Sequence, residues 1–431
     1  MSSGMDEVGM ALSVSAPSRG ESALHASALP DPGALSLSST DLAASAAEAP
    51  VIQFVNHVLA HAIGEHASDI HFEPFEREFR VRVRVDGTLR EVEACAPELA
   101  LPVTSRLKML ADLDIAERRI PQDGRIKVLQ DGQPVDLRLS TLPTQFGESV
   151  VLRVLDQAAV RLELAELGLP GGVLVELTRV IRRPAGILLV TGPTGSGKTT
   201  TLYSALRAIN TPDQKVLTIE DPVEYEIEGI RQVPVNLAAG LTFSSALRSF
   251  LRHDPDVIMV GEIRDLETAQ IGIQAALTGH LVLATMHTND APSAATRLVD
   301  MGVEPFLLAS TVEAIVAQRL VRKICPQCRA AYRPSEALLE QFGLRWEGGP
   351  PQEFHRGAGC SACRGTGFSG RMGIFEWLVM DESLRELVLA HAPVQLIRDR
   401  ASERGVRSLR QEGLRAVSEG LTTLEEIAKY L

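Results

Sequence analysis

The sequence of 431 residues predicts an α/β protein whose main unit is a doubly wound parallel sheet. Between residues 172 and 320, short apolar runs alternate with helix-prone segments, which is typical of βαβ units. A glycine-rich loop follows the first run, and acidic or histidine residues flank the later runs, near the edge where open sheets bind ligands. These observations predict a RecA-like P-loop core. The expected strands are 186–191, 215–220, 256–260 and 281–286, and the expected helices are 198–209, 243–252, 265–277 and 291–300.

The glycine-rich loop is the most specific motif in the chain. Apolar residues 187–190 lead into Gly-Pro-Thr-Gly-Ser-Gly-Lys-Thr at 192–199, and a helix-prone segment follows. Glycines let backbone N–H groups surround a phosphate, and the N-terminus of the next helix faces the same anion. Lys198 can reach the β- and γ-phosphates, and the Thr199 hydroxyl can ligate Mg²⁺. The residues predicted to bind ATP here are Gly192, Pro193, Thr194, Gly195, Ser196, Gly197, Lys198, Thr199 and Thr200.

Carboxylates follow two of the later strands. Glu220, Asp221 and Glu224 lie within five residues, where they repel one another unless a cation or water occupies the space. An acidic surface turn is the alternative. Glu262 follows the apolar run 256–260 as a Walker B acid does, and from that position a carboxylate can hold Mg²⁺ or polarise the attacking water.

Two histidines flank the fourth predicted strand, His280 before it and His287 after it. A lone histidine is more often a core residue than a functional one. Because this strand is expected to emerge beside the nucleotide, we interpret the pair as a polar sensor of the γ-phosphate.

Four of the five cysteines form two Cys-x-x-Cys pairs, Cys325 with Cys328 and Cys360 with Cys363. Each pair can give two thiolates to one tetrahedral metal, so together they fill the four positions of a structural zinc site. A redox motif is the alternative, but it needs only one such pair. The pattern predicts a tetracysteine zinc subdomain over 325–370, and Cys95 is interpreted as a small buried hydrophobic residue.

The residues before the core divide into two parts. Ala and Ser fill 22 of the first 50 positions and no aromatic residue occurs there, which predicts a disordered tail over 1–50, or else a segment that folds on a partner. Residues 51–160 fit a smaller α+β, PAS-like domain, and 161–431 the ATPase domain with its zinc subdomain and C-terminal helices. The smaller domain is expected to hold helices near 51–66 and 101–116, strands at 78–85, 135–140 and 149–155, and hairpin turns at Asp86-Gly87 and Asp131-Gly132.

The distribution of charge and hydropathy limits the partners. The net charge is −12, and this acidic balance disfavours a nucleic-acid partner. The sequence has no apolar run near the roughly 20 residues that cross a bilayer, and its start does not resemble a secretory signal. We therefore expect a cytoplasmic protein without a direct membrane span. Arg80, Arg82 and Arg84 share one strand face, which is either solvated or turned toward a neighbouring subunit's phosphate.

In combination these motifs resemble the secretion ATPases that power type II secretion systems and type IV pili. The resemblance covers about 51–431 and includes further motifs at 68–74, 118–125 and 370–373. The residues at 118–125 and 142–155 most resemble those of the type II secretion ATPase, with the pilus-extension ATPase as the alternative. The pilus-retraction type is less similar because it usually lacks the cysteine pairs.

The resemblance implies a role for each matched residue. Glu224 matches the family's candidate general base, Glu262 the acid linked to Mg²⁺, and His280 and His287 a histidine box. It also implies that arginines gather around the nucleotide between domains or subunits. These are Arg138, Arg153, Arg248, Arg252 and Arg264, of which the first two are expected to act in catalysis with Lys198, Glu224, Glu262 and His287, while Glu220 helps to bind the nucleotide.

The resemblance further implies a homo-hexamer that uses ATP, Mg²⁺ and Zn²⁺ to drive pseudopilus assembly and protein export. Its expected partners are inner-membrane secretion platform proteins (GspL-like and GspF-like), which would place it at the inner membrane peripherally. Family members usually carry a folded N-terminal docking domain, whereas only 1–50 precede the shared region here. Docking is therefore expected either through 51–160 or through a tail that folds on its partner. A nucleic-acid translocase and a nucleotide-gated binding module without turnover are the alternatives from other classes.

Overall fold

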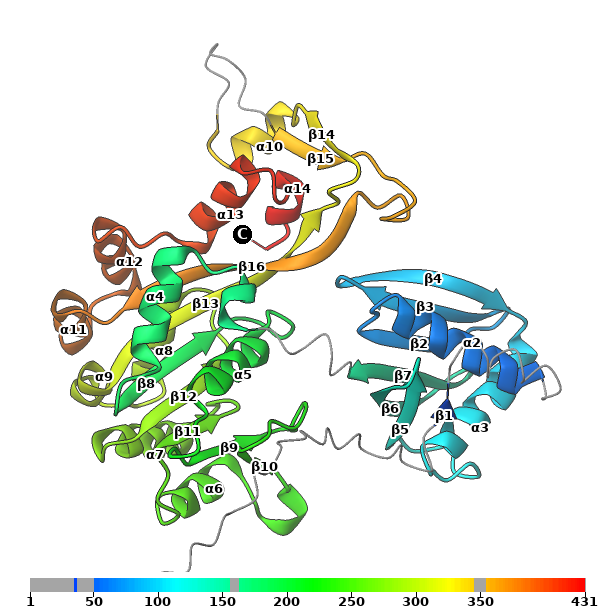
Figure 1. Ribbon diagram of the computed structural model, residues 1–431, viewed down its shortest axis with the longest axis horizontal. Coiled ribbons are helices and arrows are strands. Elements are labelled where there is room, and N and C mark those ends of the chain that lie inside the picture. Colours follow the sequence, from blue (N-terminus) through cyan, green and yellow to red (C-terminus); the bar gives the residue numbers. More distant parts are fainter. Residues whose placement is uncertain (1–34, 37–49, 156–162, 345–353, 431) are drawn as a thin grey trace, which may run out of the picture.

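Two seven-stranded sheets organise the protein, as the computed structural model shows for residues 35–36, 50–155, 163–344 and 354–430 (Figure 1). The first sheet has the strand order β1-β5-β6-β7-β2-β3-β4, and the second has the order β10-β9-β11-β12-β8-β13-β16. The expected boundary near residue 160 lies outside the described residues and stays a prediction. The expected disorder of 1–50 stays a prediction, because the structure describes only three of these residues: Leu35–Ser36, which pair with β5, and Pro50, which begins a helix.

The N-terminal sheet is antiparallel except for β1, and its turns follow from the sequence. Asp86 and Gly87 have φ values of 49° and 80°, and Asp131 and Gly132 have values of 51° and 78°. Positive φ at both central residues is what a type I′ hairpin requires, so both predicted turns are confirmed. The helix expected at 101–116 ends earlier, at Leu110. The elements are β1 (Leu35–Ser36), α2 (Pro50–Gly64), β2 (Asp69–Pro74), β3 (Phe79–Val85), β4 (Thr88–Cys95), α3 (Ala100–Leu110), β5 (Gln122–Gln130), β6 (Gln133–Thr144) and β7 (Gly147–Leu155).

The second sheet is the predicted parallel core. Its strands β8, β9, β11 and β12 are buried along their whole lengths, as strands covered by helices on both faces must be. All four strands begin within one residue of the predicted positions, and the four predicted helices are present. The elements are α4 (Gly171–Val180), β8 (Gly186–Thr191), α5 (Lys198–Ile209), β9 (Val216–Glu220), β10 (Arg231–Pro234), α6 (Phe243–Phe250), β11 (Val257–Val260), α7 (Leu266–Leu277), β12 (Leu281–Met286) and α8 (Ala291–Asp300).

The region beyond residue 320 differs from the expectation of a cysteine-rich segment followed only by helices. β13 (Val312–Ile324) pairs parallel with β8, and β16 (Phe368–Val379) pairs antiparallel with β13, so two long strands complete the core sheet. Polar residues such as Gln318 and Arg319 interrupt the apolar pattern of β13 although both are buried, which hid the strand from a reading of hydropathy.

The remaining elements form a small cysteine-bearing module and a group of C-terminal helices on one side of the core sheet (Figure 1). In the module, β14 pairs antiparallel with β15. Among the C-terminal helices, α11 packs against α9, and α13 packs against β16. None of the described helices is both long and apolar enough to cross a membrane. The elements are α9 (Pro305–Thr311), β14 (Arg329–Tyr332), α10 (Glu336–Gln341), β15 (Phe354–Gly357), α11 (Glu382–Leu389), α12 (Val394–Glu403), α13 (Leu409–Ser418) and α14 (Leu424–Ile427).

Candidate nucleotide site and candidate zinc centre

A cavity of about 760 Å³ lies where the carboxyl edge of the core sheet meets the N-terminal sheet. The loop 193–200 forms one wall, and residues from β3 and β7 of the N-terminal sheet form another. This volume is in the range of pockets that hold a small organic ligand. The predicted site residues that line it are Pro193, Thr194, Gly195, Ser196, Gly197, Lys198, Thr199, Thr200, Glu220, Glu224, Glu262, Arg264, His287 and Arg153.

The phosphate loop has the geometry that its glycines allow. Gly192, Gly195 and Gly197 all have positive φ, at 150°, 77° and 88°. A Cβ atom on Gly192 would lie 2.5 Å from the Gln318 carbonyl oxygen, and one on Gly197 would lie 2.8 Å from the Gln318 amide nitrogen. The loop therefore packs closely against β13. α5 begins directly at Lys198, so its free N–H groups face the cavity where an anion would sit.

Lys198 bends back over this loop. Its Nζ donates to the carbonyl oxygens of Gly192 at 2.8 Å and Pro193 at 3.1 Å. Burial lowers the pKa of Lys198 to about 8, with Glu262 acting to raise it and Arg319 to lower it. Carbonyl dipoles give less stabilisation to an ammonium group than phosphate oxygens do, so the arrangement suits a lysine that turns to an anion.

Glu220 lines the cavity, but its carboxylate is engaged by hydrogen bonds within the protein. Its side chain is 3% exposed and accepts hydrogen bonds from the Tyr203 hydroxyl, from Thr218 Oγ1 at 2.5 Å and from Gln232 Nε2 at 3.1 Å. Burial raises the pKa of Glu220, and Tyr203 also accepts a hydrogen bond from the Glu224 backbone N–H at 3.3 Å. Glu220 and Tyr203 thus fix the turn that carries Glu224.

Glu224 lies across the cavity from the phosphate loop and contacts the N-terminal sheet. Arg138 Nη1 of β6 lies 3.2 Å from Glu224 Oε2, and Arg138 Nη2 donates to the Val223 carbonyl oxygen. The Glu224 side chain is 34% exposed and Arg138 is 20% exposed. A carboxylate held by one cation, with its remaining surface open to the cavity, can accept a proton from water.

Glu262 joins two other predicted residues. Its Oε1 lies 3.0 Å from His287 Nε2, and its Oε2 lies 2.7 Å from Arg264 Nε. Glu262 and Thr199 both line the cavity beside Lys198. Carboxylate and hydroxyl oxygens are the donors that Mg²⁺ takes together with nucleotide phosphates and water, so the residues present fit this ion.

The N-terminal sheet turns a row of charged residues toward the same region. Cross-strand pairing places Arg138 opposite Arg153, Arg153 opposite Asp69 and Asp69 opposite Arg84. Asp69 Oδ1 lies 3.3 Å from Arg153 Nε, and Asp69 Oδ2 lies 3.6 Å from Arg84 Nε. Arg138 pairs with Glu224, whereas Arg84 and Arg153 share the single carboxylate of Asp69 at the cavity, and this excess of positive charge favours the binding of an anion.

The three arginines predicted to share one face of β3 differ in their contacts. Arg82 forms two hydrogen bonds with Glu73, and Arg80 pairs with Glu78, so both are engaged within the sheet. Arg84 lines the cavity.

Five predicted site residues do not line the cavity. Two of them, Gly192 and Arg138, contact the lining residues Lys198 and Glu224, and the other three lie elsewhere. His280 precedes β12 at the opposite edge of the sheet, where its Nδ1 lies 2.8 Å from the Ala275 carbonyl oxygen. Within one chain His280 therefore does not reach the cavity, because the carboxyl ends of the parallel strands face it. On α6 Arg248 pairs with Glu267, and just beyond that helix Arg252 donates to the Arg248 carbonyl oxygen at 2.8 Å, so within one chain neither contacts the site.

The sequence reading missed Arg319, which lines the cavity from β13. Its side chain is 6% exposed, and its Nη2 donates to the Asn289 carbonyl oxygen at 3.2 Å. The signal in the sequence that could have identified Arg319 was a charged residue within a mostly apolar run. Asp69, Arg322, Arg371 and Tyr430 also line the cavity and were not singled out as nucleotide ligands.

The four predicted cysteines converge on one point. The sulfur atoms of Cys325 and Cys360 lie 3.8 Å apart, those of Cys328 and Cys363 3.7 Å, and those of Cys360 and Cys363 3.7 Å. Four sulfurs at about 2.3 Å from a tetrahedral zinc ion lie roughly 3.8 Å from one another. Burial acts to raise the pKa of Cys363, but the backbone N–H groups of Cys360 and Gly367 lower it to about 6. The cluster therefore fits zinc.

The fold, the phosphate loop and the cysteine cluster define the class as a P-loop nucleotide-binding protein with a tetracysteine module. The family model described as "Type II/IV secretion system protein" matches residues 44–429, and the chain belongs to this family.

Named relatives agree with this assignment. The "Type II secretion system protein HxcR" of Pseudomonas aeruginosa is 53% identical over 90% of this chain and 79% of the relative. The "Type IV pilus assembly ATPase PilB" of Myxococcus xanthus is 49% identical over 90% of this chain and 69% of the relative. Among solved structures, the pilus retraction motor PilT with bound ADP has a TM-score of 0.59 and 27% identity, and the match covers 87% of this chain and 96% of the PilT chain.

Proposed function

We propose that this protein hydrolyses ATP to drive pseudopilus assembly and protein export by a type II secretion system. The observation that carries the proposal is the cavity in which the phosphate loop, Glu224, Glu262 and the arginines of the N-terminal sheet meet. Membership of the type II/IV secretion family and about 50% identity to type II secretion proteins support the cellular role.

Each residue near the cavity has a chemical task in this proposal. Lys198 and the N-terminus of α5 bind the β- and γ-phosphates, and Thr199 and Glu262 hold the Mg²⁺ that offsets phosphate charge. Glu224 orients the attacking water and takes its proton, while Arg138 fixes the position of the Glu224 carboxylate. His287 contacts Glu262 and lies at the end of β12, where it can respond to the γ-phosphate.

Assembly completes the site in the proposal. Arg248 and Arg252 lie on or just beyond α6 and do not line the cavity of their own chain, so in this proposal they contact a nucleotide bound to a neighbouring subunit. We therefore expect a homo-hexamer that associates with GspL-like and GspF-like platform proteins at the inner membrane. Zinc at the four cysteines stabilises the module over 325–370 and takes no part in hydrolysis.

A role in pilus extension is the second candidate, and one observation favours it. The identity to a pilus assembly ATPase is 49%, close to the values for type II secretion proteins. The two roles share their chemistry, so they are separated by the cell rather than by the active site. A strain that lacks the gene should lose export of periplasmic enzymes in the first case and surface pili in the second.

Hydrolysis itself is tested with purified protein. We expect Mg²⁺-dependent ATP hydrolysis whose specific activity rises with protein concentration, because the site is completed between subunits. Lys198→Ala should abolish it, whereas Lys215→Ala should not, because Lys215 lies outside the cavity and its Nζ donates to the His253 carbonyl oxygen. Hydrolysis by Lys198→Ala at the parental rate would show that this loop is not the site.

A further inference from the structure

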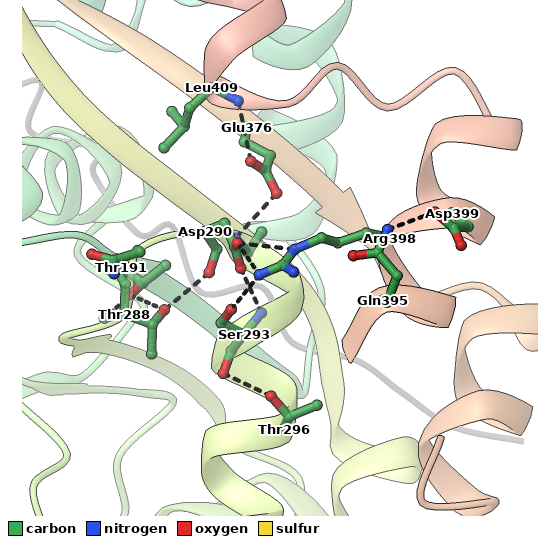
Figure 2. Close-up of polar contacts among 12 residues, drawn as sticks. Thr191, Thr288, Asp290, Ser293, Thr296, Glu376, Gln395, Arg398, Asp399 and Leu409 are labelled. Carbon is green, nitrogen blue, oxygen red and sulfur yellow. Dashed lines mark hydrogen bonds and ion pairs between the residues drawn. The ribbon is translucent and has the colours of Figure 1, made fainter. Parts of the chain in front are cut away.

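A polar network connects the strand that leads into the phosphate loop with the C-terminal helices (Figure 2). It begins at Thr191, the last residue of β8, whose neighbour Gly192 opens the phosphate loop. The Thr191 hydroxyl accepts a hydrogen bond from the Thr288 backbone N–H at 2.9 Å and lies 2.7 Å from the Thr288 hydroxyl. Because Thr288 follows His287 directly, the loop after β12 is bound to the start of the phosphate loop.

Asp290 is the next member and has two separate contacts. As the N-cap of α8, its Oδ1 accepts from the Ser293 backbone N–H at 2.8 Å. Its Oδ2 faces α12, where Arg398 donates to it from Nε at 3.1 Å and from Nη2 at 2.6 Å. The Thr288 hydroxyl donates to the Asp290 carbonyl oxygen at 3.0 Å. One residue thus links the phosphate-loop side to α12.

Glu376 of β16 binds the N-termini of α8 and α13 next to the ion pair between Asp290 and Arg398. It is 4% exposed, and its two oxygens accept from the Ala291 N–H at 3.2 Å and from the Leu409 N–H at 3.1 Å. These N–H groups belong to the first residues of α8 and α13. α12 also packs against α8. The C-terminal helices are therefore joined at several points to the element that follows His287.

The ion pair between Arg398 and Asp290 is too exposed to contribute much to folding. The Arg398 side chain is 41% exposed and that of Asp290 is 21% exposed, and exposed ion pairs add little stability. Its position matters more, because Asp290 lies three residues after His287, which contacts Glu262. A small displacement of this loop moves a residue of the reaction site, and small misplacements slow turnover strongly.

We propose that Arg398 is a positioning residue for ATP hydrolysis: through Asp290 it holds the loop that carries His287 against the strand end before the phosphate loop. The inference rests on the proposed function of the cavity and adds that α12, outside it, sets the rate of the reaction. Because this ion pair joins α12 to the loop that carries His287, movement of α12 and hydrolysis of ATP are then coupled.

The first test measures kcat, KM and the unfolding temperature of four variants. Arg398→Gln and Asp290→Asn both remove the ion pair, and asparagine keeps the N-cap of α8. We expect kcat, measured per bound nucleotide, to fall about fivefold to tenfold in each of these variants. KM and the unfolding temperature should not change. The double variant should be no slower than either single variant. Arg398→Lys should recover part of the rate because it keeps a cation.

Arg400→Gln is the matched control. Arg400 lies two residues further along α12, has 40% of its side chain exposed, and pairs with Glu403 of the same helix. It should keep the parental kcat. The proposal is overturned if Arg398→Gln also keeps the parental kcat, or if the losses in the double variant add.

A second readout does not depend on hydrolysis. Hydrogen exchange is compared with and without Mg²⁺ and a non-hydrolysable ATP analogue. In the parental protein the analogue should slow exchange at 287–290 and in α12. In Arg398→Gln the slowing should remain in α5 and disappear from α12, and its persistence in α12 overturns the inference. A parental protein that shows this coupling without hydrolysing ATP would refute the proposed function while supporting the restraint that Arg398 places on the loop at 287–290.

Discussion

Raising the pH from 7 to 9 should weaken nucleotide binding about tenfold, because Lys198 loses its proton over this range. Burial lowers the pKa of Lys198 to about 8. Roughly nine-tenths of the lysine is then charged at pH 7 and roughly one-tenth at pH 9. When only the charged form binds phosphate, the apparent Kd is the intrinsic Kd divided by the charged fraction, which gives a factor of about ten or about 1.4 kcal/mol.

The assay is equilibrium binding of a fluorescent ATP analogue with Mg²⁺ at constant ionic strength. The second pKa of a phosphate monoester is about 6, so most of the ligand has lost that proton at pH 7 and changes little above it. Lys198→Arg stays charged throughout and should bind with a Kd that does not vary with pH. Because a bound anion raises the pKa of the lysine, binding at pH 8 should also take up protons, which calorimetry in two buffers measures. An equal Kd at pH 7 and pH 9 in the parental protein would refute the reasoning.

Three further outcomes are expected. Glu224→Gln should keep nucleotide affinity and lower kcat by at least about 100-fold, since water activation is lost; a parental rate would move the role of base to Glu220 or Glu262. Arg138→Ala should lower kcat about tenfold with little change in KM, because the carboxylate loses its restraint; a change in KM alone would contradict this. Cys328→Ser should abolish the single bound zinc and expose 325–370 to protease, and a variant that still binds one zinc would contradict the four-cysteine site.

Much of the fold could be predicted because the signals are local. The core strands are buried over their whole lengths, so each appears in the sequence as a continuous apolar run. The Asp-Gly turns need positive φ at two adjacent residues, and few residue types accept that conformation. β13 was missed because it contains buried polar residues, which are tolerated only where other elements satisfy them.

The candidate site could be predicted in part for the same reason. The phosphate loop and the helix after it form one continuous segment, so the sequence specifies them directly. His280 and His287 look equivalent in the sequence, yet the direction of β12 sends one of them to each edge of the sheet. The contact between Arg138 and Glu224 joins a strand of the N-terminal sheet to the turn after β9, and no local pattern encodes it.

The sequence by itself determined the ligand-bearing segments: the phosphate loop, the acidic turn after β9, and the four thiolates with tetrahedral zinc chemistry. These depend on backbone conformation and side-chain chemistry within a few residues. Only the tertiary structure decided which arginines reach the cavity, that Glu220 is buried against Tyr203, and that Arg398 and Glu376 bind the loop after His287 to the C-terminal helices. Those arrangements arise from strand register and from the packing of elements far apart in the chain, which short-range patterns do not record.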